Sequence, residues 1–511
     1  MAQAGYSESE LAAGVAAIKA AIEAGHRPGR NPSAKRVAAD QLGWDRQKLD
    51  RVLTRAGFDW RAYCADIDRE RGRPGAMPAR GQTFLLTAAQ DETRVHEQFW
   101  RNLHVYAAFL SARIMIGGFT YQKGLFEDHA VRTGVFVPEI QPYLELDRVS
   151  LVAGRLDWLA GFNILPTAKR PLADMEGLTG GAWGIVPHAK LQLDSVPVMP
   201  GAPAKILMTT GAATVANYIQ RRAGQIAEHH HVIGATIVEV DADGSFFCRQ
   251  ISANADGSFQ DLDRVVIDGR VISGATIEAA TWGDIHRARA DPAIDAGTWG
   301  IGAGTNNRSI LDTLKPKHQF FHDTLDMRSR SHHTRGHPHQ RALRRIEGHD
   351  SVEDEVRAAA RFLSATRRSF ATSVVVESNH DEMLRKWLAD PAGASDPVNA
   401  RYWHELNLTL HRALAAGEPV SLFERAARAA AVDRLDGVRF LAAGDSYTIC
   451  QTVGGIENGL HGHIGPAGAR GSPRSLARIA PKITAGHSHT PTIRDGYFAA
   501  GHSSLPDHDY N

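Results

Sequence analysis

Polar side chains that can bind a metal ion or move a proton follow five apolar stretches in the C-terminal part of the chain. This part also holds most of the histidine, because 17 of the 25 histidines lie from His286 onward. The five segments are TWGDIH (281–286), HQFFHDTLD (318–326), VVVESNHDE (374–382), GLHGH (459–463) and KITAGHSHT (482–490). Imidazole, carboxylate and amide groups bind divalent cations through nitrogen and oxygen. We therefore expect one site built from these five segments.

Three of the segments carry two ligand-type residues two positions apart. In extended backbone, side chains at i and i+2 lie on the same face, so Asp284 and His286 can share one face. The same spacing in His461-Gly462-His463 and in His487-Ser488-His489 can aim two imidazoles into one cavity. An isolated histidine is more often a surface or core residue than a ligand. Five such segments in this order, each at a strand end, favour a shared site instead.

The other two segments offer an amide, a histidine and several carboxylates. The side-chain oxygen of Asn379 can bind a cation without adding charge, and His380 beside it can point elsewhere and act as an acid. Asp323 follows HQFFH and lies three residues before Asp326. A single carboxylate there can bridge two cations, although an aspartate at a strand end is often only a helix cap.

The five segments, taken in order, resemble the five motifs of the calcineurin-like metallophosphoesterases. In this chain the motifs read GDIH, HDTLD, SNHD, HGH and GHSH. The usual forms in that family are DxH, GDxxD, GNHD, GH and GHxH, and the resemblance covers residues 276–505. Two residues depart from the pattern, since His322 and Ser378 stand where the family has glycine. Both replace a small turn residue and not a ligand. They change what we expect of loop conformation and leave the expected metal binding unchanged.

The resemblance implies a centre of two divalent cations held by seven side chains. One cation is bound by Asp284, His286 and His489, the other by Asn379, His461 and His487, and Asp323 bridges the pair. The resemblance also implies that His380 is the general acid or the contact to the phosphate, with Asp381 orienting its ring. Possible further members of the site are His463, Asp326, His332 and His333.

The expected cofactor is a pair of Mn²⁺ ions, with Fe, Zn²⁺ and Mg²⁺ as alternatives. The three cysteines are far apart and form no CxxC, which argues against a disulfide framework and a zinc-thiolate site. Imidazole and carboxylate ligands with an amide suit Mn²⁺, Fe or Zn²⁺ better than Ca²⁺. Two such cations can clamp a phosphate and stabilise an in-line displacement by an activated water.

Two basic stretches favour a substrate with an extended phosphate backbone. Residues 328–345 and 465–479 are rich in arginine and lie close to the second and fourth segments in the sequence. Arginine beside a phosphoesterase centre suits a polyanion such as DNA, while a solvated surface loop is the alternative for each stretch. The candidate DNA contacts are Arg328, Arg330, Arg335, Arg470 and Arg474.

Much of the chain beyond residue 83 also resembles the early phage DNases that break down host DNA, typified by T-five-type phages. The similarity lies in TAAQDETRVHEQFW, IGGFTYQKGLFEDH, LMTTGAATVANYIQRRAGQIAEHHHVIGA, LDMRSRSHH and HGHIGPAGARGS. It implies a phage-encoded, Mn²⁺-dependent DNase that degrades host DNA with assistance from His380. A phosphatase or phosphodiesterase of small nucleotides is one alternative. A DNA-binding regulator with a vestigial metal fold is another.

The elements that must position these residues are predicted as a mixed α/β (α+β) chain of several parts. Residues 1–70 predict a small helical, helix-turn-helix-like domain, or a bundle that only mediates packing, and 71–82 a linker. Residues 83–275 predict a mixed α/β domain that begins strand–helix–strand and ends in antiparallel strands, with Asp-Gly hairpins. Residues 276–511 are expected to form the phosphoesterase β-sandwich flanked by helices, as the resemblance implies.

Composition narrows the class of protein without selecting a substrate. Lys+Arg (58) and Asp+Glu (57) nearly cancel, so the net charge neither supports nor excludes DNA as partner. No apolar run reaches membrane length and the first residues lack the features of a signal peptide, so we expect a cytoplasmic protein that contacts no membrane. We also expect a homo-oligomer, and the sequence leaves the role of the middle region open, with assembly as one candidate.

Overall fold

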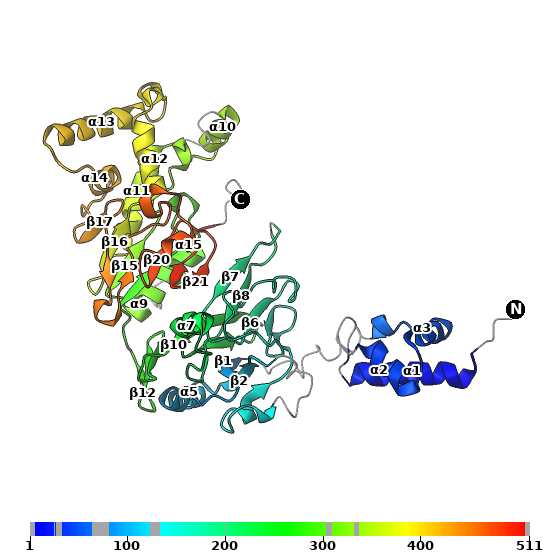
Figure 1. The fold of residues 1–511 in the computed structure, drawn as a ribbon. Helices are drawn as coiled ribbons and strands as arrows, with labels where there is room; N and C mark the ends of the chain where they lie inside the picture. The colour runs from blue at the N-terminus through cyan, green and yellow to red at the C-terminus, as the bar shows by residue number, and fades with distance from the viewer. Residues whose placement is uncertain are drawn as a thin grey trace.

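The computed structural model describes residues 6–24, 26, 33–63, 81–122, 133–199, 201–302, 309–331 and 337–505 (Figure 1). In these ranges the chain contains both helices and strands, and the strands form four sheets, which gives the mixed α/β character expected from the sequence. None of the helices in this part of the chain has the length and apolar character that a membrane crossing requires.

Three short helices come first, and they share a small apolar core around Ile18 and Leu49. The second helix ends at Gly43, which adopts the left-handed backbone (φ +64) typical of helix termini. The third begins after Asp45, whose side chain accepts a hydrogen bond from the backbone of Lys48. The predicted succession of two helices around a turn is present, and its binding to DNA stays a prediction. The helices are α1 (Glu8–Glu23), α2 (Ala34–Leu42) and α3 (Arg46–Arg55).

The middle region opens with the strand–helix–strand unit that the sequence predicts. β1 and β2 pair in parallel, and α5 buries Phe99 and Leu103 against them. Two antiparallel strands continue the sheet beyond β1, in the order β10-β9-β1-β2-β3. The elements are β1 (Gln82–Gln90), α5 (Glu97–Leu110), β2 (Arg113–Phe119), β3 (Leu144–Glu145), β9 (Gly234–Val240) and β10 (Phe246–Ser252).

A separate three-stranded antiparallel sheet confirms one of the predicted hairpins. Its tight turn consists of Asp268 (φ 49) and Gly269 (φ 71), and positive φ at both central residues matches the twist of the flanking strands. The strands are β11 (Phe259–Asp261), β12 (Arg264–Ile267) and β13 (Arg270–Ser273).

A ten-stranded sheet crosses residue 276, the boundary predicted between the middle and C-terminal regions. Its order is β18-β19-β20-β22-β21-β7-β8-β6-β5-β4, and the antiparallel pair β7–β21 joins the two parts. Beside this pair, Ser195 donates a hydrogen bond to the Pro491 carbonyl (3.1 Å) and Arg494 forms an ion pair with Asp194 (2.8 Å). The strands are β4 (Val149–Val152), β5 (Leu156–Trp158), β6 (Trp183–Val186), β7 (Leu193–Val196), β8 (Lys205–Thr209), β18 (Thr448–Ile449), β19 (Ile456–Glu457), β20 (Ile483–Ala485), β21 (Thr492–Arg494) and β22 (Tyr497–Ala499).

A four-stranded parallel sheet carries the first three predicted segments. Its order is β14-β15-β16-β17. On one face, Phe321 and Val375 share a core with buried residues of α11, α12 and α14, and on the other, Phe320 and Val374 share a core with Ile449 of β18. Figure 1 shows α11, α12 and α14 close to this sheet. The sheet therefore lies between helices and the C-terminal part of the ten-stranded sheet. The elements are β14 (Ala279–Thr281), β15 (His318–Phe321), β16 (Thr372–Val376), β17 (Val438–Leu441), α10 (Pro338–Ile346), α11 (Val352–Ala365), α12 (Asn379–Leu388), α13 (Ala400–Ala415) and α14 (Leu422–Ala430).

Candidate metal centre

Three of the predicted segments meet because their strands are parallel neighbours. β14, β15 and β16 pair side by side and run in the same direction, so the residues that follow them emerge at one edge of the sheet. Asp284, Asp323 and Asn379 lie just beyond these three strand ends. The buried valines of β16 hold Asn379 at this edge, because Val374, Val375 and Val376 are at most 2% exposed.

The other two segments reach the same edge from the ten-stranded sheet. His461 lies four residues beyond β19, and His487 two residues beyond β20, which pairs in parallel with β19. The backbone of His487 donates a hydrogen bond to Asp284 Oδ1 (3.1 Å), which ties the fifth segment to the first. In the same way, the backbone of His286 donates to the Asp323 carbonyl (2.8 Å).

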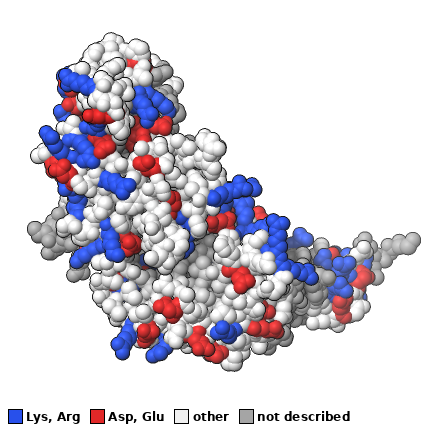
Figure 2. Space-filling model, turned by 60° about the vertical axis from the view of Figure 1, so that its left-hand side comes forward, with Lys and Arg blue, Asp and Glu red and all other residues white. Residues whose placement is uncertain are grey.

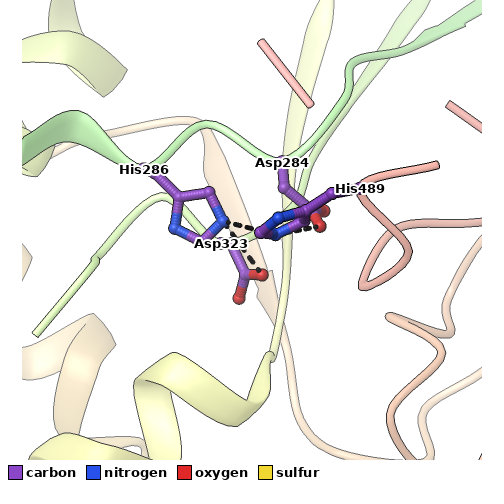
Figure 3. A group of neighbouring side chains, drawn as sticks. All are labelled: Asp284, His286, Asp323 and His489. Atoms are coloured by element: carbon purple, nitrogen blue, oxygen red, sulfur yellow. Dashed lines mark hydrogen bonds and ion pairs between the residues drawn. The ribbon is translucent and has the colours of Figure 1, made fainter. Parts of the chain in front are cut away.

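Two groups of histidine and aspartate side chains in the described ranges could hold a cation: His286 with Asp326 and His380, and the group of four drawn in Figure 3. Asp284, His286, Asp323 and His489 each present a ligand atom, and these atoms lie within 4.8 Å of one another. His286 Nε2 is 3.0 Å from His489 Nε2, and His489 Nε2 is 3.6 Å from Asp284 Oδ2. Three of these side chains are buried, and His489 is partly exposed at 39%.

A second group converges on the amide oxygen of Asn379. His461 Nε2 lies 2.9 Å and His487 Nδ1 lies 3.0 Å from Asn379 Oδ1. Asp323 links the two groups, because its Oδ2 atom is 3.3 Å from His461 Nε2 and 3.7 Å from His286 Nε2. The structure therefore brings together all seven side chains that the family resemblance implied as ligands, with Asp323 between the two groups.

The donor set fits divalent cations. Asp284 Oδ2 and Asp323 Oδ1 are buried and accept no hydrogen bond from the described residues, and a buried carboxylate without a partner is costly. Burial and then the charge of Asp323 raise the pKa of Asp284 to about 7. Burial lowers the pKa values of His487 and His489 to about 4. These two imidazoles are therefore neutral at physiological pH, the form that binds metal.

Asp326 lies on the far side of His286 from the first group. Its Oδ1 atom is 3.3 Å from His286 Nδ1, the ring nitrogen opposite the one that faces His489. Burial alone would lower the pKa of His286, but the hydrogen bond to Asp326 and the neighbouring carboxylates raise it to about 9. A carboxylate in this position orients the imidazole toward a metal. Asp326 thus belongs to the site as a partner of His286.

The predicted contact from Asp381 to the ring of His380 is wrong. His380 Nδ1 lies 2.6 Å from the backbone carbonyl of Asp326, while Asp381 Oδ2 accepts a hydrogen bond from the backbone of Ser378 (2.9 Å). The reason is that His380 and Asp381 are consecutive residues of α12, and side chains at i and i+1 on a helix do not face each other. The ring of His380 is nevertheless beside the site, with its centroid 4.8 Å from that of His286.

Both departures from the family pattern have structural roles. Ser378 is the N-cap of α12, since its hydroxyl accepts a hydrogen bond from the backbone of Asp381 (3.3 Å) while Asp381 binds the Ser378 backbone in return. His322 is fully buried, and its Nδ1 atom lies 3.4 Å from His461 Nδ1. Burial lowers the pKa of His322 to about 3, so its ring is neutral.

Of the three further histidines that the sequence suggested for the site, the structure describes His463. The His463 ring centroid lies 5.4 Å from that of His461, and its Nε2 atom is 3.7 Å from Glu382 Oε1. His463 therefore borders the second group without joining its ligand atoms. His332 and His333 lie outside the described residues, as does the candidate DNA contact Arg335.

The candidate DNA contacts fall into different environments. Arg330 is buried and bonds Asp396 (2.5 and 2.9 Å) and Asp350, so its prediction as a DNA contact is wrong. Its guanidinium forms ion pairs with two carboxylates inside the protein. Arg328 is 18% exposed and lies 3.6 Å from Glu347, whereas Arg470 and Arg474 are exposed. On the face shown in Figure 2, basic and acidic side chains are interspersed over much of the surface.

The sequence prediction missed one histidine of the site. His502 pairs with Asp284 in an isolated parallel bridge, and its ring centroid lies 5.7 Å from that of His489. Burial lowers its pKa. It follows β22 in YFAAGHSS, the same pattern of apolar strand and then histidine that marked the other segments. That pattern could have identified it.

The chain is similar to a curated phage protein. It is 34% identical over 447 residues to "Protein A1" of Escherichia phage T5, and the match covers 84% of this chain and 78% of that protein. Neither a protein-family profile nor a solved structure matches the sequence.

Proposed function

This chain belongs to the same family as Protein A1 of Escherichia phage T5, and we propose that it is a phage-encoded, metal-dependent nuclease that hydrolyses phosphodiester bonds of DNA. The observation that carries the proposal is the pair of ligand groups joined by Asp323. Two adjacent sites for hard or borderline cations suit displacement at phosphorus. The name of the phage relative states no activity, so the chemistry rests on the site.

Each group has the side chains to hold one cation, and we expect Mn²⁺ in both. The first would be bound by Asp284, His286 and His489, the second by Asn379, His461 and His487, with Asp323 shared. When bound, the two cations would neutralise phosphate oxygens and lower the pKa of a water molecule. Asp326 would keep the ring of His286 in the orientation that ligation requires.

His380 is the residue that we assign to proton transfer or to contact with the phosphate. Its Nδ1 atom is held by the Asp326 carbonyl at 2.6 Å, which fixes the ring at the edge of the first group. We propose that Nε2 contacts the phosphate or gives a proton to the leaving oxygen. Because Asp326 contacts both His286 and His380, one residue would align a ligand and an acid.

DNA is the proposed substrate because the segment that follows His463 carries exposed arginines. Arg470 and Arg474 are exposed and lie on the segment between the fourth and fifth motifs. The backbone of Gly471 donates a hydrogen bond to the His463 carbonyl (3.1 Å), so this segment folds back to His463, which borders the second group. Arginine there can contact phosphates on either side of the scissile bond. Host DNA in the bacterial cytoplasm is the target that we propose.

The test compares nuclease and phosphatase activities of the purified full-length protein. Linear and circular duplex DNA, p-nitrophenyl phosphate and a cyclic nucleotide are incubated with protein in Mn²⁺ or in EDTA. We expect DNA to be cut only with Mn²⁺, and the Asn379→Ala and His380→Ala variants to lose at least about a hundredfold in rate. His404→Ala, which changes an exposed histidine of α13, is the matched control and should cut as the wild type does.

Two outcomes would refute the nuclease proposal. Turnover of a small phosphate ester with DNA left intact would make the protein a small-molecule phosphoesterase. DNA that is bound but never cut, together with no Mn²⁺-dependent turnover of either small ester, would favour the regulator.

A further inference from the structure

His322 occupies a position where the resembled family has glycine, and its side chain is fully buried against the second ligand group. It directly follows β15 and precedes Asp323, the residue shared by both groups. Its Nδ1 atom lies 3.4 Å from His461 Nδ1, and the two ring centroids are 5.5 Å apart. The ring therefore touches a proposed ligand from the side away from the cation.

The contact reaches the nitrogen of His461 that does not face the second group. His461 Nε2 points to Asn379 Oδ1 (2.9 Å) and Asp323 Oδ2 (3.3 Å). An imidazole that binds a cation through Nε2 carries its proton on Nδ1, and that N–H needs an acceptor. His322 Nδ1 is at hydrogen-bond distance to accept it.

The room for this ring is provided by a glycine in the fifth segment. A Cβ atom added at Gly486 would lie 2.8 Å from His322 Cβ and 2.3 Å from Asp284 Oδ1. Any side chain at position 486 would therefore collide with His322 or with a ligand of the first group. His322 fills the space beside the second segment, and this space is available because Gly486 has no side chain.

Packing alone does not explain a histidine at this position. When Nδ1 accepts from His461, the proton of the His322 ring is on Nε2, which is buried and has no hydrogen-bond partner among the described residues. An unpaired buried N–H is unfavourable, and an apolar side chain of similar size would avoid it. Among the described residues, the hydrogen bond with His461 is therefore the one interaction that explains a polar ring at this position.

We infer that His322 is a positioning residue that orients His461 for the second cation. This inference rests on the proposed metal centre and concerns only one of its two positions. Loss of a residue that orients a ligand typically weakens metal binding about 10- to 100-fold. The first cation, whose ligands do not include His461, should bind as before.

The test measures Mn²⁺ binding to full-length protein by calorimetry and counts bound metal by elemental analysis after dialysis. His322→Leu removes the acceptor, His322→Asn keeps a side-chain oxygen that can accept, and His318→Leu is the control. His318 is the first residue of β15, the strand that His322 directly follows, but its ring bonds the Tyr447 hydroxyl (3.1 Å). We expect His322→Leu to bind one Mn²⁺ normally and the second about 10- to 100-fold more weakly. His322→Asn should recover part of the loss, and His318→Leu should bind both ions as the wild type does.

The outcomes separate this inference from the proposed function. If the wild type binds no Mn²⁺, the metal centre and this inference both fail. If the wild type and His322→Leu both bind two ions with equal affinity, only the positioning role of His322 fails. If His322→Leu does not fold, His322→Ala, which also lacks an acceptor, replaces it: second-ion binding about 10- to 100-fold weaker than in the wild type supports the role, and equal binding of both ions overturns it.

Discussion

Asp284 and Asp323 are neighbouring buried carboxylates whose pKa values are shifted in opposite directions. Burial and the charge of Asp323 raise the pKa of Asp284 to about 7. Burial alone would also raise the pKa of Asp323, but the charges of His461 and His380 and the hydrogen bond from His461 hold it well below its ordinary value. His286, with a pKa of about 9, is protonated at neutral pH. A metal-free site of this kind holds protons that an incoming cation must displace.

We predict that the affinity for Mn²⁺ rises with pH up to about pH 9. A cation binds the deprotonated forms, so protons compete with it below the pKa of Asp284 (about 7) and of His286 (about 9). Affinity should therefore increase as the pH rises through both values and level off above the higher one. Calorimetric titration at neutral pH in buffers of different ionisation enthalpy should detect proton release on binding. An affinity independent of pH with no proton release would contradict this.

Arg330 is the arginine whose place differs most from the sequence prediction. It lies between Asp396 and Asp350, and its guanidinium holds the pKa of Asp396 at about 2 even though burial of that carboxyl opposes the shift. Removing one partner of a buried ion pair leaves an uncompensated charge, which typically costs about 3–5 kcal/mol.

We predict that Arg330→Met lowers the free energy of unfolding by roughly 3 kcal/mol. Urea denaturation of the full chain measures this change. Arg474→Met, at an exposed arginine, is the control and should leave stability within about 0.5 kcal/mol of wild type. A variant at Arg330 that keeps its stability but loses DNA binding would instead support the original assignment.

At the scale of elements, the start of helix α12 links the fold to the site. Ser378 caps this helix, and the next two residues are Asn379, at the centre of the second ligand group, and His380. The helix is held by Leu384 and Trp387 in the core beneath the parallel sheet. A serine where the resembled family has glycine therefore stabilises the turn that presents both residues.

We predict that Ser378→Ala costs about 1 kcal/mol of stability and weakens Mn²⁺ binding, because the first turn of α12 loses its cap. Ser378→Gly should cost only a few tenths of a kcal/mol, since glycine is tolerated at an N-cap. Thermal unfolding and calorimetric titration with Mn²⁺ test whether Ser378→Ala has the larger effect of the two variants. Equal effects of alanine and glycine would show that the hydroxyl does not stabilise this turn.

At the scale of the whole molecule, the middle and C-terminal regions share a sheet. β7 pairs with β21, and Ser195 bonds the carbonyl of Pro491, two residues after His489. Lys190 also forms an ion pair with Asp495 at 2.6 Å. The segment that carries His489 is therefore supported by residues that come almost 300 positions earlier in the chain.

We predict that residues 276–511 produced alone do not bind two Mn²⁺ ions, because β21 loses its neighbour and the His489 segment its support. Residues 81–511, which retain the whole ten-stranded sheet, should bind both ions with nearly the affinity of the full chain. Metal counting after dialysis and circular dichroism of both fragments check this. A fragment 276–511 that binds two ions would mean that the middle region contributes nothing to the centre.

The sequence by itself determined which ligand-type residues the segments carry, and the ordered resemblance to the phosphoesterase motifs implied that the segments share one site. Strand periodicity and ligand type are local properties, so GDIH, SNHD and GHSH could be identified, and the hairpin at Asp268-Gly269 could be placed. The tertiary structure alone decided that Asp326, 54 residues away, holds His380, that Arg330 is internal, and that β7 pairs with β21. Successive helical residues diverge by roughly 100°, which removes Asp381 from the ring of His380. Contacts between distant residues depend on strand pairing and packing across the whole chain, and no local pattern encodes them.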